Sequence, residues 1–284
     1  MWNSEAEQIQ AIIDFALAED IGDGDVTALC TVPAERRYKG EFLVKAYGVI
    51  AGLDVVEQTF RTVDPSIEFD RRIADGTAVQ PGDIVAKVTG PGRALLSAER
   101  TGLNFLQRMS GIATATRRHV DAVAGTRAII LDTRKTAPGQ RLTDKQAVVH
   151  GGGQNHRIGL FDMVLIKENH IAAAGGITAA VNRVRACDDR SRPIEVEVRN
   201  IPELEEALEL HVDRIMLDNM GTAAMRAAVE LVADRVPLEA SGGVNLESVR
   251  AIAETGVDFI SVGALTHSVT ALDVSFLLED VTEL

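Results

Sequence analysis

The feature of this sequence that most restricts its fold is a regular alternation of short apolar runs and amphipathic stretches beyond residue 127. Six runs rich in branched aliphatic side chains are predicted as strands, at 128–131, 163–166, 194–198, 214–217, 237–240 and 259–262. Segments with helical spacing of apolar residues fall between them, at 177–186, 203–210, 223–233 and 246–254. Because such strands are buried on both faces, we expect a parallel sheet, either a (β/α) barrel or an open doubly wound sheet.

Polar residues and glycines follow each predicted strand, and this favours the barrel. In a barrel the carboxyl ends of all strands meet at one mouth, whereas a doubly wound sheet collects functional residues at one switch point. The residues concerned are Thr133, Arg134, Lys135, Lys167, Glu197, Asp218, Ser241, Gly242, Gly243 and Gly263. Since fewer than the eight strands of a complete barrel are visible, the sequence predicts an incomplete one.

The first part of the chain follows a different pattern. Residues 38–88 show period-two alternation and glycine turns, which predict a small antiparallel layer. Predicted strands lie at 40–52 and 67–73, a hairpin around Pro81-Gly82-Asp83 at 79–88, and helices at 9–18 and 94–124.

The formal net charge of −13 argues against partners that carry many negative charges. Nucleic acid and anionic membrane surfaces would both be repelled, so neither is expected as a partner. No apolar run is long enough to span a bilayer, and residues 1–20 lack the basic flank of a signal peptide. Cys30 and Cys187 match no metal-ligand spacing and are predicted as reduced thiols, which favours a cytoplasmic protein.

Cations gather locally despite this acidic balance. They are Arg134, Lys135, Arg141, Lys145, Arg157 and Lys167, with only Asp144 and Asp162 among them. A charge run is most often a solvated helix face, but three glycines at 151–153 and His156 indicate loop and binding-site residues instead. Arg134 can grip a carboxylate with two hydrogen bonds and Lys135 offers a point charge, so we expect a ligand with several anionic groups.

Glycine turns follow the last two predicted strands. Ser241-Gly242-Gly243 stands between a strand and a predicted helix start, where free backbone N–H groups and the helix dipole bind phosphate. Gly263 supplies a second glycine turn after the final strand. Phosphate sites at these two places recur in barrels, so we expect a bound phosphate ester.

Acidic side chains at neighbouring strand ends are candidates for contacts to a metal or a sugar. Glu195 and Glu197 alternate on one strand and therefore point to the same face, and Asp218 ends the next strand. Carboxylates near a polyphosphate commonly hold Mg²⁺ or ribose hydroxyls. Lys167 ends a buried strand and needs a partner, for which Glu168, Glu197, Asp218 and the substrate are the candidates.

From about residue 18 to residue 268 the chain resembles the quinolinate phosphoribosyltransferase family. The blocks that carry the resemblance are Glu99-Arg100-Thr101, Leu103-Asn104, Thr133-Arg134-Lys135-Thr136, residues 151–159, Leu165-Ile166-Lys167-Glu168-Asn169-His170, Glu195-Val196-Glu197, Leu217-Asp218-Asn219 and Glu239-Ala240-Ser241-Gly242-Gly243. The chain departs from the family pattern at Ala137 and at Glu168, where aspartate is more usual. Neither position is assigned to the chemistry.

This resemblance implies a fold, a reaction and an assembly. The fold is mixed α/β, with an N-terminal α/β open sandwich (1–110, joined by 268–284) and an incomplete (β/α) barrel that carries the active site (111–267). The reaction joins quinolinate to phosphoribosyl pyrophosphate (PRPP), with Mg²⁺ as cofactor. Its products are nicotinate mononucleotide, pyrophosphate and carbon dioxide, on the route to NAD. The assembly is a homodimer in which Arg100 reaches the site of the partner subunit.

Roles for individual residues follow from the resemblance and from the chemistry above. The expected catalytic residues are Lys135, Lys167, Glu197 and Asp218, of which Glu197 and Asp218 would also hold Mg²⁺. Quinolinate is expected to bind Arg100, Thr133, Arg134, His156, Arg157 and Lys167. PRPP is expected to bind Lys135, Glu197, Asp218, Ser241, Gly242, Gly243, Gly263, Ala264 and His267.

Two other functions remain open at this stage. One is a related transferase of the same fold that acts on another anionic ring. The other is a non-catalytic barrel protein that binds a phosphate ligand. Glu195 and Glu197 beside Lys167 argue against the second, because simple binding does not require buried acids that face a cation.

Overall fold

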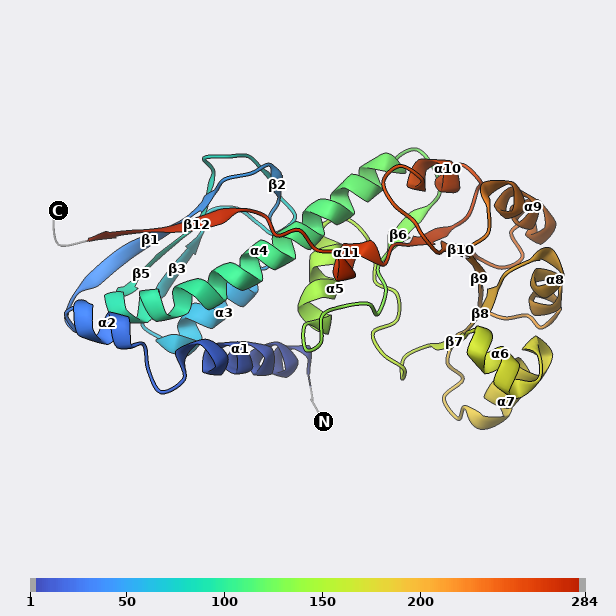
Figure 1. The fold of residues 1–284 in the computed structure, drawn as a ribbon, viewed down its shortest axis with the longest axis horizontal. Coiled ribbons are helices and arrows are strands. Elements are labelled where there is room, and N and C mark those ends of the chain that lie inside the picture. The colour runs from blue at the N-terminus through green and yellow to red at the C-terminus, as the bar shows by residue number, and fades with distance from the viewer. Residues whose placement is uncertain (1–3, 281–284) are drawn as a thin grey trace. The chain divides into compact units, whose positions relative to one another are not determined.

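The computed structural model describes residues 4–280, which form two compact units (Figure 1). The first, called here the sandwich unit, comprises the chain up to residue 117, residues 136–152 and the chain from residue 268. The second, the barrel unit, comprises residues 118–135 and 153–267. Residues 1–3 and 281–284, which the predicted N-terminal domain includes, lie outside the described residues.

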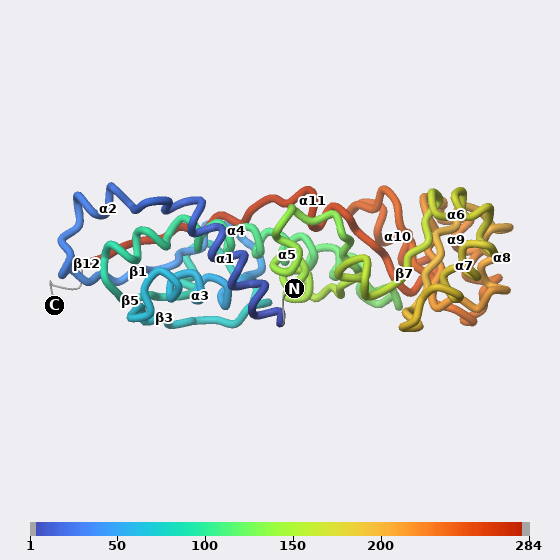
Figure 2. The backbone as a smooth tube through the Cα atoms, turned by 90° about the horizontal axis from the view of Figure 1, so that it is seen from below, coloured from blue at the N-terminus to red at the C-terminus, as the bar shows by residue number. Residues whose placement is uncertain are grey.

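The sandwich unit is built on a four-stranded antiparallel sheet, as the alternation within residues 38–88 predicted. The strand order is β12 (Val274–Asp280), β1 (Arg37–Val44), β5 (Ile84–Pro91) and β3 (Glu68–Arg71). The last strand thus pairs with the first, from Val44↔Val274 to Tyr38↔Asp280 (Figure 2). Along β1 the residues from Gly40 to Val44 alternate between buried and half-buried, so one face of the sheet is apolar.

Helices cover the apolar face of this sheet. The helices of the sandwich unit are α1 (Glu5–Ile21), α2 (Val26–Thr31), α3 (Leu53–Val63), α4 (Gly92–Ala122) and α5 (Arg141–His150). Residues of β1, α3 and α4 share one core, in which Phe42 and Phe60 meet edge to face with ring centroids 5.7 Å apart. Within residues 4–280 none of the helices, the 31-residue α4 included, has the length and apolar character needed to cross a membrane.

The predicted hairpin at 79–88 is wrong. Gly82 does adopt the left-handed conformation of a turn, with φ +99°. However, β4 (Ala78–Val79) pairs with β2 (Gly48–Val49), while β5 pairs with β1 and β3. The two arms of the turn therefore enter different sheets, because each finds a partner strand that is distant in sequence.

The prediction that the cation-rich stretch consists of loop and site residues is wrong for helix α5. This helix lies in the sandwich unit, and its Lys145 and Asp144 are buried, with exposures of 1% and 0%. Arg108 holds Asp144 with two hydrogen bonds of 2.8 Å, which offset the cost of burying the carboxylate. Arg141 and Lys145 thus belong to a different unit from Arg134 and Arg157.

The barrel unit holds a six-stranded parallel sheet, which confirms the predicted α/β class. Its order is β6 (Ile129–Leu131), β11 (Phe259–Ser261), β10 (Leu238–Ser241), β9 (Arg214–Asp218), β8 (Ile194–Val198) and β7 (Val164–Ile166). In the part of the chain that the structure describes, β6 and β7 are the two edges and do not pair, so the barrel is incomplete.

Helices connect these strands, and Figure 1 shows α7, α8 and α9 on the outer side of the sheet. The helices of this unit are α6 (Glu168–Ala174), α7 (Ile177–Cys187), α8 (Ile201–Glu209), α9 (Thr222–Val232), α10 (Val249–Ala253) and α11 (Ala264–His267). Local sequence signals mark the start of α8. The Asn200 side chain accepts a hydrogen bond from the Glu203 N–H, and Pro202 stands in the first turn of the helix. Fully buried Val196, Ile215 and Ile260 hold the strands together.

Candidate active site

A cavity of about 690 Å³ opens in the barrel unit where the strands end. It collects every predicted site residue except Arg100 and Glu197, namely Thr133, Arg134, Lys135, His156, Arg157, Lys167, Asp218, Ser241, Gly242, Gly243, Gly263, Ala264 and His267. Five further residues line it that the sequence did not single out as site residues: Leu165, Met216, Asn219, Val244 and Ser261. Residues from the ends of five of the six strands, all but β8, therefore share one cavity, as expected for a barrel mouth.

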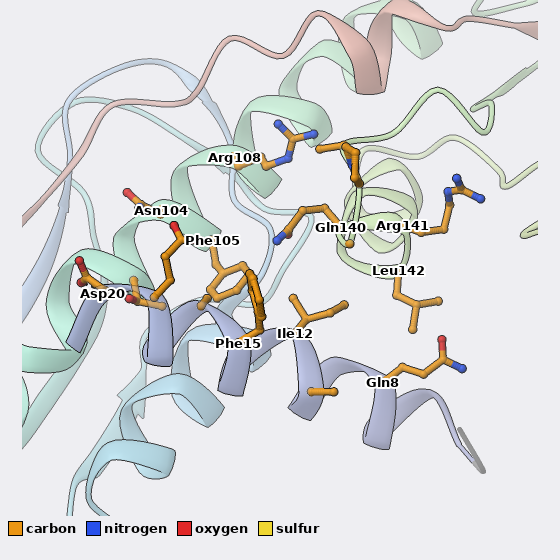
Figure 3. A pocket seen from close by; sticks show the side chains of 17 residues that line it. Gln8, Ile12, Phe15, Asp20, Asn104, Phe105, Arg108, Gln140, Arg141 and Leu142 are labelled. Atoms are coloured by element: carbon orange, nitrogen blue, oxygen red, sulfur yellow. Dashed lines mark hydrogen bonds between the residues drawn. The ribbon is translucent and has the colours of Figure 1, made fainter. Parts of the chain in front are cut away.

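A larger cavity of about 790 Å³ lies in the sandwich unit, lined by α1, α4 and residues 137–142 (Figure 3). Its wall includes the apolar side chains of Phe15 and Phe105, and its Arg108 is already bound to Asp144. Arg100 is exposed on α4 and lines neither cavity. We take the barrel cavity as the candidate active site because the cations and the glycine turns lie there.

Arg134 and Arg157 provide the cationic wall of the barrel cavity. Burial and the nearby charge of Arg134 both lower the pKa of Arg157, so two like charges are held close together in partly buried surroundings. Arg157 Nη1 also donates to the main-chain oxygen of Met163 at 3.2 Å, which restricts the side chain. Two neighbouring guanidinium groups repel each other unless an anion binds them, so the wall suits a ligand with carboxylates.

His156 lies over a buried acidic pair that comes from two different strands. Its Nε2 is 3.0 Å from Glu195 Oε2 on β8 and 3.4 Å from Glu239 Oε2 on β10. Glu239 also pairs with Arg214 Nη1 at 3.0 Å and accepts a hydrogen bond from the Ser261 hydroxyl. The sequence did not identify Glu239 as a functional residue, although a glutamate inside a buried strand is a usable signal.

Opposing effects set the proton affinities in this buried cluster. Burial alone would lower the pKa of His156, but the two carboxylates outweigh it and raise that pKa to about 9. Burial raises the pKa of Glu195 to about 7, although the neighbouring His156 imidazole opposes the rise. Burial also acts on Glu239, whose pKa is nevertheless lowered by the neighbouring His156 imidazole and by the hydrogen bond from Ser261.

The same cluster has the donor types of a metal site, since one atom each of His156, Glu195 and Glu239 lies within 4.8 Å of the others. The guanidinium of Arg214 is bound to Glu239, and its positive charge would repel a metal ion there. The carboxylate charge is thus already matched by side-chain cations, and we assign no metal to this cluster.

Lys167 finds its partner in Glu197. Its Nζ lies 3.3 Å from Glu197 Oε2, while the alternative partner Glu168 pairs with Arg199. The Glu197 side chain is only 10% exposed and does not line the cavity, whereas its partner Lys167 does. Asp218 does line the cavity, and its carboxylate accepts a hydrogen bond of 2.8 Å from the Asn219 amide.

The glycine turn after β10 depends on residues without side chains. Gly242 and Gly243 have φ of +103° and +61°. A Cβ on Gly242 would lie 2.2 Å from Asn219 Oδ1, so no larger residue fits at that position. The expected helix start directly after this turn is wrong, because α10 begins only at Val249. A phosphate bound here would therefore meet turn N–H groups rather than a helix dipole.

Comparison with known proteins identifies the family. The profile described as "Quinolinate phosphoribosyl transferase, N-terminal domain" matches residues 25–110, and that of the C-terminal domain of the same enzyme matches residues 112–277. The chain belongs to the quinolinate phosphoribosyl transferase family. The predicted family resemblance is confirmed, and the whole candidate active site lies within the match to the family's C-terminal domain.

Relatives of this family resemble the chain over nearly its whole length. A rice protein named nicotinate-nucleotide pyrophosphorylase [carboxylating], chloroplastic, is 47% identical over 95% of this chain and 78% of its own. A probable enzyme of the same name from Bacillus subtilis is 41% identical over 97% of this chain and 94% of its own. The crystal structure of NadC from Streptococcus pyogenes is 37% identical and superposes with a TM-score of 0.94, covering 99% of this chain and 100% of its own.

Proposed function

We propose that this protein transfers the phosphoribosyl group of PRPP to quinolinate, with loss of carbon dioxide, to give nicotinate mononucleotide and pyrophosphate in NAD biosynthesis. Membership of the family supports this function, and so do the names of its relatives. The structural observation that carries the proposal is a single cavity that combines neighbouring arginines with a glycine turn at the strand ends. The arginines suit a dicarboxylate, and the glycine turn suits a phosphate ester.

Quinolinate would bind through its two carboxylates to Arg134 and Arg157, with Lys167 beside them. The 5′-phosphate of PRPP would bind at the turns of Gly242–Gly243 and Gly263, which places the ribose near Asp218. Holding both substrates in one cavity removes much of the entropic cost of bringing the ring nitrogen to the anomeric carbon. Bond formation there releases pyrophosphate, which Lys135 would neutralise.

Asp218 and Glu197 supply negative charge near the sugar as it becomes cation-like in the transition state. Once the ring nitrogen is alkylated it carries a positive charge, which stabilises the electron pair left on ring carbon 2 as carbon dioxide departs. A proton then takes the place of the lost carboxylate. The cations that hold quinolinate therefore position the ring for both steps.

The donor set of the cavity fits Mg²⁺, which we propose as cofactor. Mg²⁺ prefers carboxylate and phosphate oxygens and usually retains water. Asp218 lines the cavity and would hold the ion, with Glu197 acting through water because it does not line the cavity. When bound, Mg²⁺ would neutralise charge on the pyrophosphate group.

Quinolinate is expected to be used in strong preference to nicotinate, which lacks one carboxylate and would leave a cation of the wall without a partner. The expected ratio of kcat/KM is at least about 10⁴, as for sites whose buried polar groups lose their partner. Steady-state assays with each acid at saturating PRPP measure it. Equal turnover of nicotinate would instead indicate the related transferase that acts on another ring.

The glycine turn supplies a second test. Gly242→Ala is expected to raise the KM for PRPP by about 10- to 100-fold, because the new methyl group meets Asn219 and the positive φ adds strain of about 1–3 kcal/mol. Gly125→Ala is the matched control, since Gly125 has φ +81° with no atom within 4 Å of an added Cβ. A normal KM for PRPP in Gly242→Ala would place the phosphate elsewhere.

We also propose a homodimer in which Arg100 completes the site of the partner subunit. Arg100 is exposed on the sandwich unit and is not one of the residues that line the cavity of the barrel unit. Co-expression of Arg100→Ala and Lys167→Ala chains is expected to restore about a quarter of the parental activity, since half the dimers are mixed and each has one intact site. No recovery in purified mixed dimers would count against this arrangement.

A cytoplasmic location remains part of the proposal. Cys30 and Cys187 are both exposed and free, as in a reducing compartment. Some plant relatives are named chloroplastic or mitochondrial, so the location is to be tested by fractionating cells and blotting for the protein.

A further inference from the structure

Glu195 is a buried carboxylate to which the proposed reaction gives no role. It is 0% exposed and does not line the cavity, although His156, which it contacts, does. Its neighbour Glu239 is bound by Arg214 and Ser261 and thus has partners of its own. Burying a carboxylate is costly, so one that is placed beneath a binding site needs a reason beyond packing.

His156 connects this buried pair to the cationic wall. Its main-chain N–H donates to Asp132 Oδ1 at 2.8 Å, which fixes the backbone at the end of β6. Its Nδ1 accepts from the main-chain N–H of Arg157 at 2.7 Å, while Nε2 faces Glu195 at 3.0 Å. The ring is therefore held at both nitrogens, one toward Arg157 and the other toward the acids.

The connection through Nδ1 requires the neutral ring, because a protonated Nδ1 cannot accept from the Arg157 N–H. The carboxylates favour a second proton on His156, whereas the hydrogen bond from Arg157 favours a bare Nδ1. With Nδ1 bare, the hydrogen of the neutral ring is on Nε2, the nitrogen that lies 3.0 Å from Glu195 Oε2. Glu195 therefore acts on the rotation of the imidazole from the Nε2 side, and the bare Nδ1 in turn supports the backbone that carries the Arg157 guanidinium.

We infer that Glu195 is a positioning residue for quinolinate, acting through His156 and Arg157 without touching the substrate. This inference rests on the proposed function of the cavity. An arginine that grips a carboxylate with two hydrogen bonds is sensitive to its placement, because both bonds require one orientation of the guanidinium plane. Loss of Glu195 should thus impair quinolinate binding and leave PRPP binding, at the glycine turns, nearly intact.

The test compares Glu195→Ala with Glu195→Gln, which keeps an oxygen able to accept from Nε2. Glu195→Ala is expected to weaken quinolinate binding by calorimetry about 10- to 100-fold, as for small misplacements of binding groups, with the KM for PRPP within about twofold. Glu195→Gln is expected to remain within about threefold of the parent for both substrates. Ile260→Val, which trims a fully buried side chain of β11, is the control for general damage to the barrel.

A double-mutant cycle tests whether the effect passes through His156. In a His156→Ala background, Glu195→Ala is expected to change quinolinate binding by less than about twofold, because the connection is already broken. Additive losses, equal losses for both substrates, or a Gln variant as impaired as the Ala variant would each overturn the inference. If the parent itself fails to bind quinolinate, the proposed function fails instead, and the two failures are thereby distinguished.

Discussion

Replacing Asp218 by asparagine is expected to lower kcat about 10- to 1,000-fold while the affinity for quinolinate changes little. The substitution keeps the shape of the side chain at the end of β9 but removes its charge. A charge that stabilises a cation-like sugar matters in the transition state far more than in the ground state. The apparent Mg²⁺ concentration needed for half-maximal activity should rise as well.

Turnover at saturation, Mg²⁺ titration and calorimetry with quinolinate measure these effects separately. Asp234→Asn is the matched control, since Asp234 belongs to the same unit, is 78% exposed and has φ +60°, which asparagine tolerates. If quinolinate binding is abolished while turnover at saturation stays normal, the positions assigned to the two substrates are reversed.

Replacing Arg157 by methionine is expected to raise the dissociation constant of quinolinate by about 100-fold, the usual size for removing one member of a desolvated charge pair. The KM for PRPP should change far less, because the glycine turns do not involve this side chain. Arg157→Lys should recover only part of the loss, since an ammonium group cannot grip a carboxylate with two parallel hydrogen bonds.

Arg226→Met on α9 is the control for this series, because Arg226 is an exposed arginine of the same unit outside the cavity. Binding is measured by calorimetry and PRPP affinity by steady-state kinetics. A larger loss for PRPP than for quinolinate would assign Arg157 to the phosphates and would require a different carboxylate site.

The barrel could be predicted from the sequence because its signals are local. Each strand is a short apolar run, and β8 (Ile194–Val198) has the predicted bounds. The pairing of β2 with β4 and the burial of α5 could not be predicted, because both depend on contacts between distant segments. In the sequence, Lys145 groups with the loop and site cations, because Arg108, the partner of the adjacent buried Asp144, lies on another helix.

The same distinction, between local signals and contacts of distant segments, applies to the candidate site. Residues at strand ends were predicted because a barrel brings them to one mouth whatever its detailed register. The contacts of His156 with Glu195 and Glu239 could not be predicted, since they depend on which residues of β8 and β10 face each other inside the barrel unit. Glu197 was expected to line the site, yet its ion pair with Lys167 keeps it behind the cavity wall.

The pairing of β12 with β1 has a consequence for synthesis of the protein. During translation, β1 leaves the ribosome long before Val274–Asp280 exist, and the barrel residues 153–267 must be made in between. Until then the nascent sandwich sheet has an open edge along β1, the kind of edge that recruits other strands. The sheet can close only after synthesis of the barrel. Termination of the chain between residue 267 and Val274 would therefore leave a barrel attached to an unfinished and aggregation-prone sheet.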